Sequence, residues 1–319
     1  MKKVISILTC LCLLMTTGCS RQETIRFGAA GVGGMYYPFA NAFTELASKD
    51  ETGINWKVKS TAGSAANLRL LSDNYIELGI AQADLIEDAY YGKGSFHSGK
   101  YRGYKAVASL YPEACQIVVR KDSGITSLDD LEGKNVSVGE EESGTERNAT
   151  QILEMCGLPD NLVNTKNLDY TDAADQLAEK KIDAFFCTAG ICTTVIEELT
   201  KECDIRLLEI PESCRQKLKK AYSFYDDYVI PAGTYSGQTE DIQTISVQSV
   251  LLASSTLSEK TVQKLTASLF KHIKDIQYSI SINLQLTPQE AVKGITIPFH
   301  PGAETYYKLE GVELPEVES

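Results

Sequence analysis

The stretch TIRFGAAGVGGMYYPFANAF, residues 24–43, contains the pattern that decides the fold. Apolar and polar side chains alternate over residues 24–28, which predicts a strand. The glycine-rich residues 31–34 predict a turn, and Pro38 opens a helical stretch that ends near Ala47. A strand, a tight turn and a helix in this order form the repeating unit of an α/β fold.

The alternation of strands and helices continues along the chain. It predicts further strands at residues 54–60, 78–81, 106–110, 116–120, 135–138, 182–186 and 205–210, and further helices at residues 64–71, 84–91, 127–131, 145–155, 171–180 and 193–200. We expect Ser64 to cap the helix that it precedes. Apolar residues at steps of three and four from Val262 to Ile276 predict one long helix.

This order predicts an α/β chain with two lobes, each a mostly parallel sheet flanked by helices. We expect the first lobe to contain residues 25–115 and 246–319, and the second lobe to contain residues 116–245. The chain would cross between the lobes twice, because no long linker separates the two sets of elements.

The N-terminus has the pattern of an export signal. Two lysines precede an uncharged segment, residues 4–15, which is shorter than the ~20 apolar residues of a membrane span. Residues 16–19, TTGC, resemble a bacterial lipobox, although Thr16 stands where leucine is usual. We predict a lipoprotein signal peptide over residues 1–18, a lipid-modified Cys19 and a tether over residues 19–24. The protein would then be extracytoplasmic and lipid-anchored to the bacterial cell membrane; the alternative is ordinary secretion.

Charge and composition exclude two classes of protein. The chain has 31 Lys and Arg against 43 Asp and Glu, a net charge of −12, and loss of the leader removes two of the lysines. Such an acidic chain is a poor nucleic-acid binder, because phosphate contacts need a basic face. With 43% hydrophobic residues it is not a disordered chain either.

The mature chain retains six cysteines besides the lipid site, and all lie in its middle third: Cys115, Cys156, Cys187, Cys192, Cys203 and Cys214. Disulfides form outside the cell, but the sequence does not select their pairing. Cys187 with Cys192, and Cys203 with Cys214, are close enough in sequence to pair. Buried free thiols are the alternative. No zinc-type spacing occurs, and we expect no metal site.

Four turns follow strands where α/β proteins bind ligands: residues 31–37, 61–67, 82–84 and 143–145. Each places small side chains and backbone amides at a helix start, which favours a carboxylate or a phosphate. Any one of them alone is an ordinary tight connection. The first is not a dinucleotide motif, because Tyr36 stands where the third glycine is required. No catalytic motif accompanies these turns, so we expect no enzyme and no cofactor.

Several segments together resemble the TAXI family, the solute receptors of a subclass of TRAP transporters. The most specific are GMYYP at residues 34–38, GSAAN at residues 63–67 and SGT at residues 143–145, in that order. The resemblance covers nearly all of residues 25–305. It implies a type II periplasmic-binding-protein fold with a ligand cleft between the lobes. It also implies a monomeric receptor that delivers its solute to a TRAP-type membrane permease.

The resemblance also implies the ligand contacts. By motif position these are Gly34, Met35, Tyr36, Ser64, Asn67, Gln82, Asp84, Tyr111, Glu113, Ser143, Gly144 and Thr145. Gly190 matches a further family glycine, but the proline that usually follows it is absent and two cysteines flank the turn. The departure weakens any transfer of ligand identity.

The expected ligand is a small carboxylate, and an amino acid such as glutamate fits best. Ser64, Asn67 and the amides of residues 143–145 would bind the carboxylate, and Tyr36 and Tyr111 would form walls. Asp84 or Glu113 would hold an ammonium group, unless they serve as a hinge hydrogen bond or a helix cap. Two alternatives stay open: a receptor of an ABC importer for another small organic ligand, and an enzyme or sensor domain on the same fold.

Overall fold

The structure is a computed structural model that describes residues 23–317, except residues 52, 160, 281–283 and 285. The predicted signal peptide and Cys19 lie outside the described residues. The first strand begins at Glu23, so the last two residues of the predicted tether belong to the folded domain. No helix in the described part of the chain combines the length and the apolar character of a membrane span.

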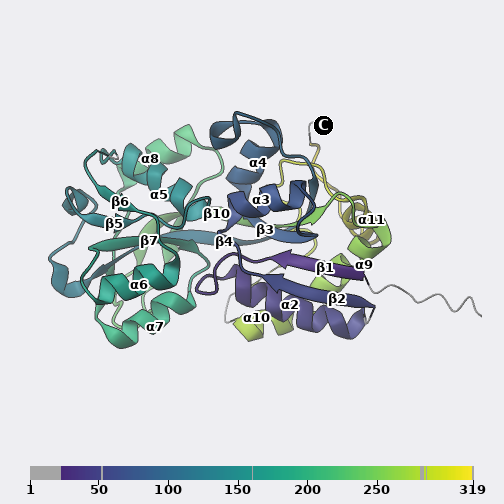
Figure 1. Cartoon of the computed structure of the whole chain (residues 1–319), viewed down its shortest axis with the longest axis horizontal. Helices are drawn as coiled ribbons and strands as arrows, with labels where there is room; N and C mark the ends of the chain where they lie inside the picture. Colours follow the sequence, from purple (N-terminus) through teal and green to yellow (C-terminus); the bar gives the residue numbers. More distant parts are fainter. Residues whose placement is uncertain (1–22, 52, 160, 281–283, 285, 318–319) are drawn as a thin grey trace, which may run out of the picture.

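One sheet of ten strands runs through the described part of the chain (Figure 1). The order along it is β2-β1-β3-β10-β4-β7-β5-β6, while β8 pairs with β4 and β9 pairs with β10. The strands are β1 (Glu23–Gly28), β2 (Ile54–Lys59), β3 (Leu78–Gln82), β4 (Tyr104–Arg120), β5 (Asn135–Ser137), β6 (Asn164–Lys166), β7 (Ala184–Ala189), β8 (Ile205–Leu207), β9 (Asp226–Ile230) and β10 (Ile242–Ser254).

The two halves of the sheet are joined by the long strands β4 and β10. They pair antiparallel with each other, whereas the outer pairs β1–β2, β1–β3, β5–β6 and β5–β7 are parallel. The sequence predicted separate strands at residues 106–110 and 116–120, and both are parts of β4. Pro112 interrupts the apolar pattern between them, and the register with β10 shifts just beyond its partner Gln248, where a bulge absorbs the irregularity.

Helices cover both faces of the sheet (Figure 1). They are α2 (Tyr36–Asp50), α3 (Ser64–Ser72), α4 (Ala83–Tyr91), α5 (Gly144–Met155), α6 (Tyr170–Ala178), α7 (Thr194–Glu202), α8 (Glu212–Ala221), α9 (Glu259–Lys271), α10 (Ile273–Ile280) and α11 (Pro301–Leu309), with 3₁₀ turns η1 (Gly94–Phe96), η2 (Lys121–Ser123) and η3 (Asp129–Leu131). The predicted helix at residues 127–131 is only the turn η3.

The single long helix predicted over residues 262–276 is wrong, because α9 ends and α10 begins around His272. His272 has non-helical backbone angles, and its Nε2 lies 2.9 Å from the Asp50 carboxylate at the end of α2. Lys271 pairs with the same carboxylate. These two contacts tie the junction to α2, while the apolar periodicity continues through the break.

Among the residues that the structure describes, the buried apolar side chains form three clusters. The first contains residues from 25–111 and 250–307, and the other two contain residues from 115–247 and 114–242. We use "first lobe" for the part of the molecule around the first cluster and "second lobe" for the part around the other two. Strands β4 and β10 contribute to both lobes and form the crossing between them.

Candidate ligand-binding cleft

A cavity of about 510 Å³, its open mouth included, lies where the two lobes meet. Both lobes contribute to the wall, mostly through loops that follow strands and through the first residues of helices. The lining residues are Ala30, Gly31, Gly34, Met35, Tyr36, Ala62, Gly63, Ser64, Gln82, Glu113, Glu140, Ser143, Gly144, Thr145, Asp169, Tyr170, Thr188 and Ala189.

Four helices, α2, α3, α5 and α6, begin at this cavity. The first amides of a helix have no partner within it and carry partial positive charge, so they attract anions. At α3 these amides are already used, because Ala65 N and Ala66 N donate to the Glu142 carbonyl of the second lobe at 3.1 and 3.4 Å. The start of α5, at Gly144 and Thr145, faces the cavity.

Ser64 is not the helix cap that the sequence predicted. Gly63 holds the capping position with φ of 129°, a conformation that favours glycine, and a Cβ added there would lie 3.3 Å from Ser143 Cα of the other lobe. Ser64 is the first helical residue, and its Oγ accepts a hydrogen bond from Gln82 N at 3.1 Å. The hydroxyl therefore joins α3 to the end of β3.

The lobes are in direct contact beside the cavity. Arg147 of the second lobe lies between two carboxylates of the first: its Nε is 3.4 Å from Asp84 Oδ2, and its Nη2 pairs with Asp88. Arg69 pairs with Glu142 across the same boundary. Burial raises the pKa of Asp84 to about 6, although Arg147 opposes this shift. Asp84 thus belongs to an ion pair between lobes rather than to the cavity wall.

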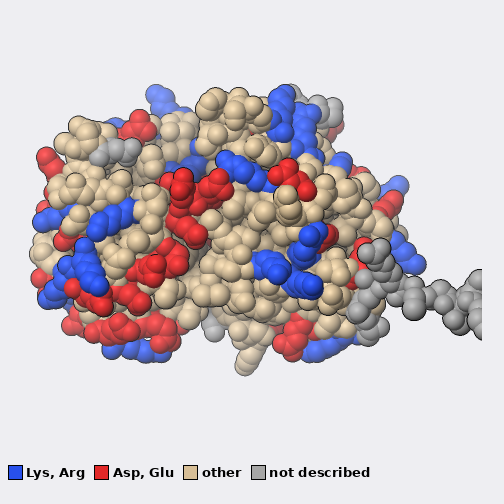
Figure 2. Space-filling view, viewed as in Figure 1, with Lys and Arg blue, Asp and Glu red and all other residues tan. Residues whose placement is uncertain are grey.

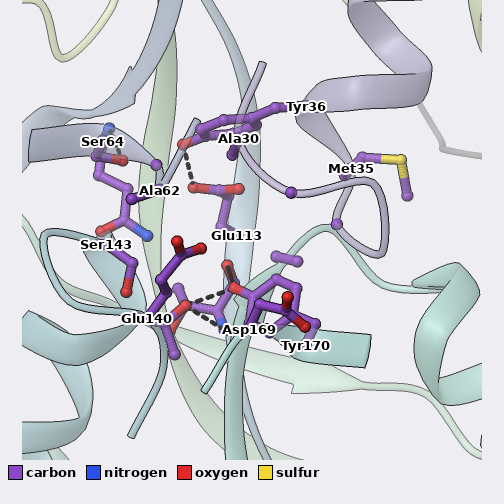
Figure 3. A pocket seen from close by; sticks show the side chains of 18 residues that line it. Ala30, Met35, Tyr36, Ala62, Ser64, Glu113, Glu140, Ser143, Asp169 and Tyr170 are labelled. Carbon is purple, nitrogen blue, oxygen red and sulfur yellow. Dashed lines mark hydrogen bonds between the residues drawn. The ribbon is translucent and has the colours of Figure 1, made fainter. Parts of the chain in front are cut away.

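Glu113 lies deep in the cavity wall, on β4. Its carboxyl is 2% exposed, and its Oε2 accepts a hydrogen bond of 2.7 Å from the Tyr36 hydroxyl (Figure 3). Burial raises the pKa of Glu113 to about 8, against the opposing hydrogen bonds from Tyr36 and Gln82. With this pKa, the Glu113 carboxyl is mostly protonated at neutral pH.

The second-lobe wall contains a network of hydroxyl groups. The Tyr170 hydroxyl donates to Thr188 O at 3.0 Å, so its close contact of 2.5 Å with Thr145 Oγ1 is a hydrogen bond donated by Thr145. Thr188 N donates in turn to Thr145 Oγ1 at 3.2 Å. The Thr145 hydroxyl is therefore engaged by its own lobe, and it positions Tyr170 beside the cavity.

The mouth of the cavity is acidic. Glu140 and Asp169 line this cavity (Figure 3) and also line an adjoining, more open one. Asp169 caps α6 by accepting from Asp172 N at 2.8 Å, and partial burial together with Asp169 raises the pKa of Glu140. On the face shown in Figure 2, acidic side chains gather on the second lobe toward the boundary with the first.

Most of the residues expected at the site line the cavity: Gly34, Met35, Tyr36, Ser64, Gln82, Glu113, Ser143, Gly144 and Thr145. The expected contacts Asn67, Asp84, Tyr111 and Gly190 do not. Asn67 Nδ2 donates to Gly28 O and Ile80 O, which ties β1 to β3. Tyr111 packs on Phe39, with ring centroids 6.2 Å apart, and Ala189 rather than Gly190 reaches the wall.

The sequence reasoning missed Glu140, Asp169 and Tyr170. Asp169 had a signal, because an aspartate stands just before the predicted helix start at residue 171 and caps it. Glu140 and Tyr170 had none, since nothing local in the sequence shows that the two loops face the same cavity.

The cysteine pairings suggested by closeness in sequence are wrong. The structure pairs Cys156 with Cys214, which joins the C-terminal end of α5 to α8. Cys187 and Cys192 are free, as are Cys115 and Cys203. The two cysteines are 58 residues apart in sequence, and the packing of α5 against α8 brings them together.

Comparison with known proteins identifies the fold. The alkanesulfonate-binding protein SsuA from Xanthomonas axonopodis pv. citri matches at 15% identity, with a TM-score of 0.51, over 90% of this chain and 83% of its own. A binding-protein component of an ABC phosphonate transporter from Pseudomonas aeruginosa matches at 13% identity with a TM-score of 0.52, over 82% of this chain and 80% of its own. A protein from Bordetella bronchiseptica RB50 matches at 18% identity with a TM-score of 0.55, over 91% of this chain and 80% of its own.

These similarities confirm the predicted fold, the α/β fold of type II periplasmic binding proteins. A family model gives the closer relationship. The model of the NMT1-like family matches residues 27–311, which is nearly the whole of the described chain. On this match the chain belongs to the NMT1-like family.

Proposed function

We propose that this protein is an extracytoplasmic solute-binding protein, which takes up a small organic solute between its lobes and delivers it to a membrane transporter. The observation that carries the proposal is the cavity between the lobes, whose wall combines helix starts with buried polar groups. Gln82 is 2% exposed in this wall, and within the described part of the chain no group donates to its Oε1. A bound solute would satisfy this buried acceptor.

An ABC importer is the first candidate for the transporter. The solved structures named above include binding proteins for alkanesulfonates and phosphonates, the latter described as part of an ABC transporter. A TRAP-type permease is the second candidate, supported by the resemblance of the GMYYP, GSAAN and SGT segments to TAXI receptors. Uptake into vesicles that contain each candidate permease separates them: an ABC importer requires ATP, and a TRAP permease requires an ion gradient.

An amino acid is the solute class that we propose. Its carboxylate would bind the first amides of α5, at Gly144 and Thr145, rather than Ser64 and Asn67, whose side chains are engaged within the first lobe. Glutamate has a second carboxylate, and none of the described residues that line the cavity is Lys, Arg or His. A neutral or basic amino acid therefore fits the wall better than glutamate does.

Native mass spectrometry of the exported protein, purified without denaturation, tests the function by detecting a bound small molecule, and calorimetry then measures its affinity. We expect Gly144→Ala to lose binding at least tenfold, because an added Cβ would meet the Gln82 amide and hold the lobes apart. Gly99→Ala is the matched control, since a Cβ there meets no atom within 4 Å. Equal affinity in both variants would remove the cavity from the proposed function.

A further inference from the structure

Glu113 is a buried carboxyl without a cationic partner. It is 2% exposed, and among the described residues that line the cavity there is no Lys, Arg or His to pair with it. Arg147, at the boundary between the lobes, is paired with Asp84 and Asp88. A carboxylate is normally buried in its ionised form only beside a cation, so Glu113 ionises fully at neutral pH only if the solute supplies the positive charge.

The groups next to Glu113 favour a hydrogen-bond donor in the cavity. Tyr36 donates its only hydroxyl proton to Glu113, and the Gln82 side chain donates a further hydrogen bond to the carboxyl. The Gln82 amide is thereby oriented, which leaves its Oε1 as an acceptor without a donor. Two acceptors of different residues thus line one cavity, and an ammonium group supplies several donors at once.

The outer part of the cavity wall also favours a positively charged solute group. Glu140 and Asp169 add two carboxyl groups to the wall, and Tyr170 lies beside Asp169 there (Figure 3). Acidic side chains around a low-dielectric cleft raise the local concentration of cations. The ring of an aromatic residue also attracts a cation through its π face.

We propose that the solute carries a protonated amino group, and that this group binds against Glu113 and the Oε1 of Gln82. The proposal rests on the solute-binding function and specifies the charge that the solute must have. Because Glu113 is protonated when the cavity is empty, the arriving ammonium displaces that proton to solvent and pairs with the carboxylate that remains. The amine keeps its own proton throughout.

The groups around Glu113 determine its pKa, and this pKa determines how amine binding depends on pH. The titratable groups that interact with it from the elements packed around it are Tyr36, Asp84, Tyr111, Cys115, Tyr170 and Cys187. All are neutral or acidic, so none favours the ionised form by charge, and burial raises the pKa of Glu113 to about 8. Amine binding should therefore strengthen roughly tenfold from pH 6 to pH 7 and level off above about pH 8.

The test is a panel of matched pairs on the full exported protein: the common amino acids, taurine and putrescine, each beside the analogue in which hydrogen or a hydroxyl group replaces the amino group. Thermal shift finds binders, and calorimetry at pH 7 in two buffers of different ionisation enthalpy counts protons. We expect only amines to bind, with release of roughly one proton. Glu113→Gln should weaken amine binding at least tenfold and abolish proton release, while Glu141→Gln, an exposed neighbour of the cleft, changes neither.

Several results would overturn the inference. Binding of a deaminated analogue as tight as its amine, amine binding that Glu113→Gln leaves unchanged, or a panel without any amine binder would each do so. The solute-binding function fails separately: it is lost when native mass spectrometry finds no solute and no member of either half of the panel binds. A bound solute that has no amino group, and whose binding is lost in Gly144→Ala, would support the solute-binding function and contradict the proposed amino group.

Discussion

At the scale of single residues, Glu113 sets a measurable dependence of stability on pH. The pKa of this carboxyl rises from 4.5 to about 8 on folding, so between these values the folded protein binds more protons than the unfolded chain. The free energy of unfolding of the empty protein should therefore fall as pH increases from about 5 to 8. Asp84, whose pKa rises from 3.8 to about 6, adds to the fall in the lower part of this range.

Glu113→Gln should remove most of this dependence. Glutamine keeps an acceptor for the Tyr36 hydroxyl but cannot ionise, so the variant should be more stable than the wild type by about 1–3 kcal/mol at pH 8 and nearly equal at pH 5. Urea unfolding of the empty proteins at both pH values measures the difference, with Glu141→Gln as the control. A wild-type stability that rises from pH 5 to pH 8, with no gain from the substitution, would show that Glu113 is ionised in the folded state.

Single residues also show how far the sequence determines the site. The glycine and hydroxyl turns predicted the cavity wall around Tyr36, Ser64 and Gly144, because a turn after a strand is local information. The partner of each side chain is not local. Ser64 accepts from Gln82, and Asp84 pairs with Arg147, 63 positions away, so their roles follow only from the packing of separate segments.

At the scale of elements, the disulfide between α5 and α8 should stabilise the second lobe without forming part of the cleft. Cys156 follows the last residue of α5, and Cys214 lies on α8. Cys214→Ala should lower the free energy of unfolding by about 2–4 kcal/mol and leave solute affinity unchanged. Chemical unfolding with and without a reductant measures this. Cys203→Ala, at a free and half-buried thiol, is the control. If reductant and Cys214→Ala leave the stability unchanged, the disulfide does not contribute to it.

Elements were predicted well where apolar periodicity was strong. Helix α5 ends at Met155 and β2 begins at Ile54, as predicted. Helix α8 was missed because it buries only Cys214 and Leu218 and is otherwise polar, so it shows little apolar periodicity. Helix α11 was missed although it carries a start signal, with His300 as its cap and Pro301 in the first turn.

At the scale of the whole molecule, the sequence predicts two lobes but not the continuous sheet that joins them. The predicted boundaries, residues 25–115 with 246–319 and residues 116–245, remain a prediction. The three apolar clusters change over within residues 111–115 and 242–250, along the two crossing strands. A change in the angle between the lobes would have to bend or twist β4 and β10, and Glu113 lies on β4 inside the cavity wall.

The last prediction concerns the closed arrangement of the lobes. Arg147 is the contact across the boundary that neutralises two first-lobe carboxylates, Asp84 and Asp88. Replacing it with glutamine leaves Asp84 without its cation and leaves Asp88 with only the charge of Lys93 nearby, which favours separation of the lobes and their hydration. We expect Arg147→Gln to increase the radius of gyration in small-angle scattering and to weaken solute binding about tenfold, while the fold stays intact by circular dichroism. Arg215→Gln, which breaks an ion pair with Asp227 inside the second lobe, is the control.

The pH dependence of closure has a definite sign. Burial raises the pKa of Asp84 to about 6 where the lobes meet, above the 3.8 of a hydrated carboxyl, although Arg147 opposes the shift. The joined lobes therefore bind a proton at Asp84 more tightly than separated, hydrated lobes do, so acidification from pH 7.5 to pH 5 should favour the joined arrangement. In Arg147→Gln the opposing charge is lost, so closure on acidification should be larger than in the wild type. Scattering profiles of both proteins at pH 5 and pH 7.5 measure the two shifts. A wild-type protein that opens on acidification, or a variant that shifts less than the wild type, would mean that Asp84 does not control the contact between the lobes.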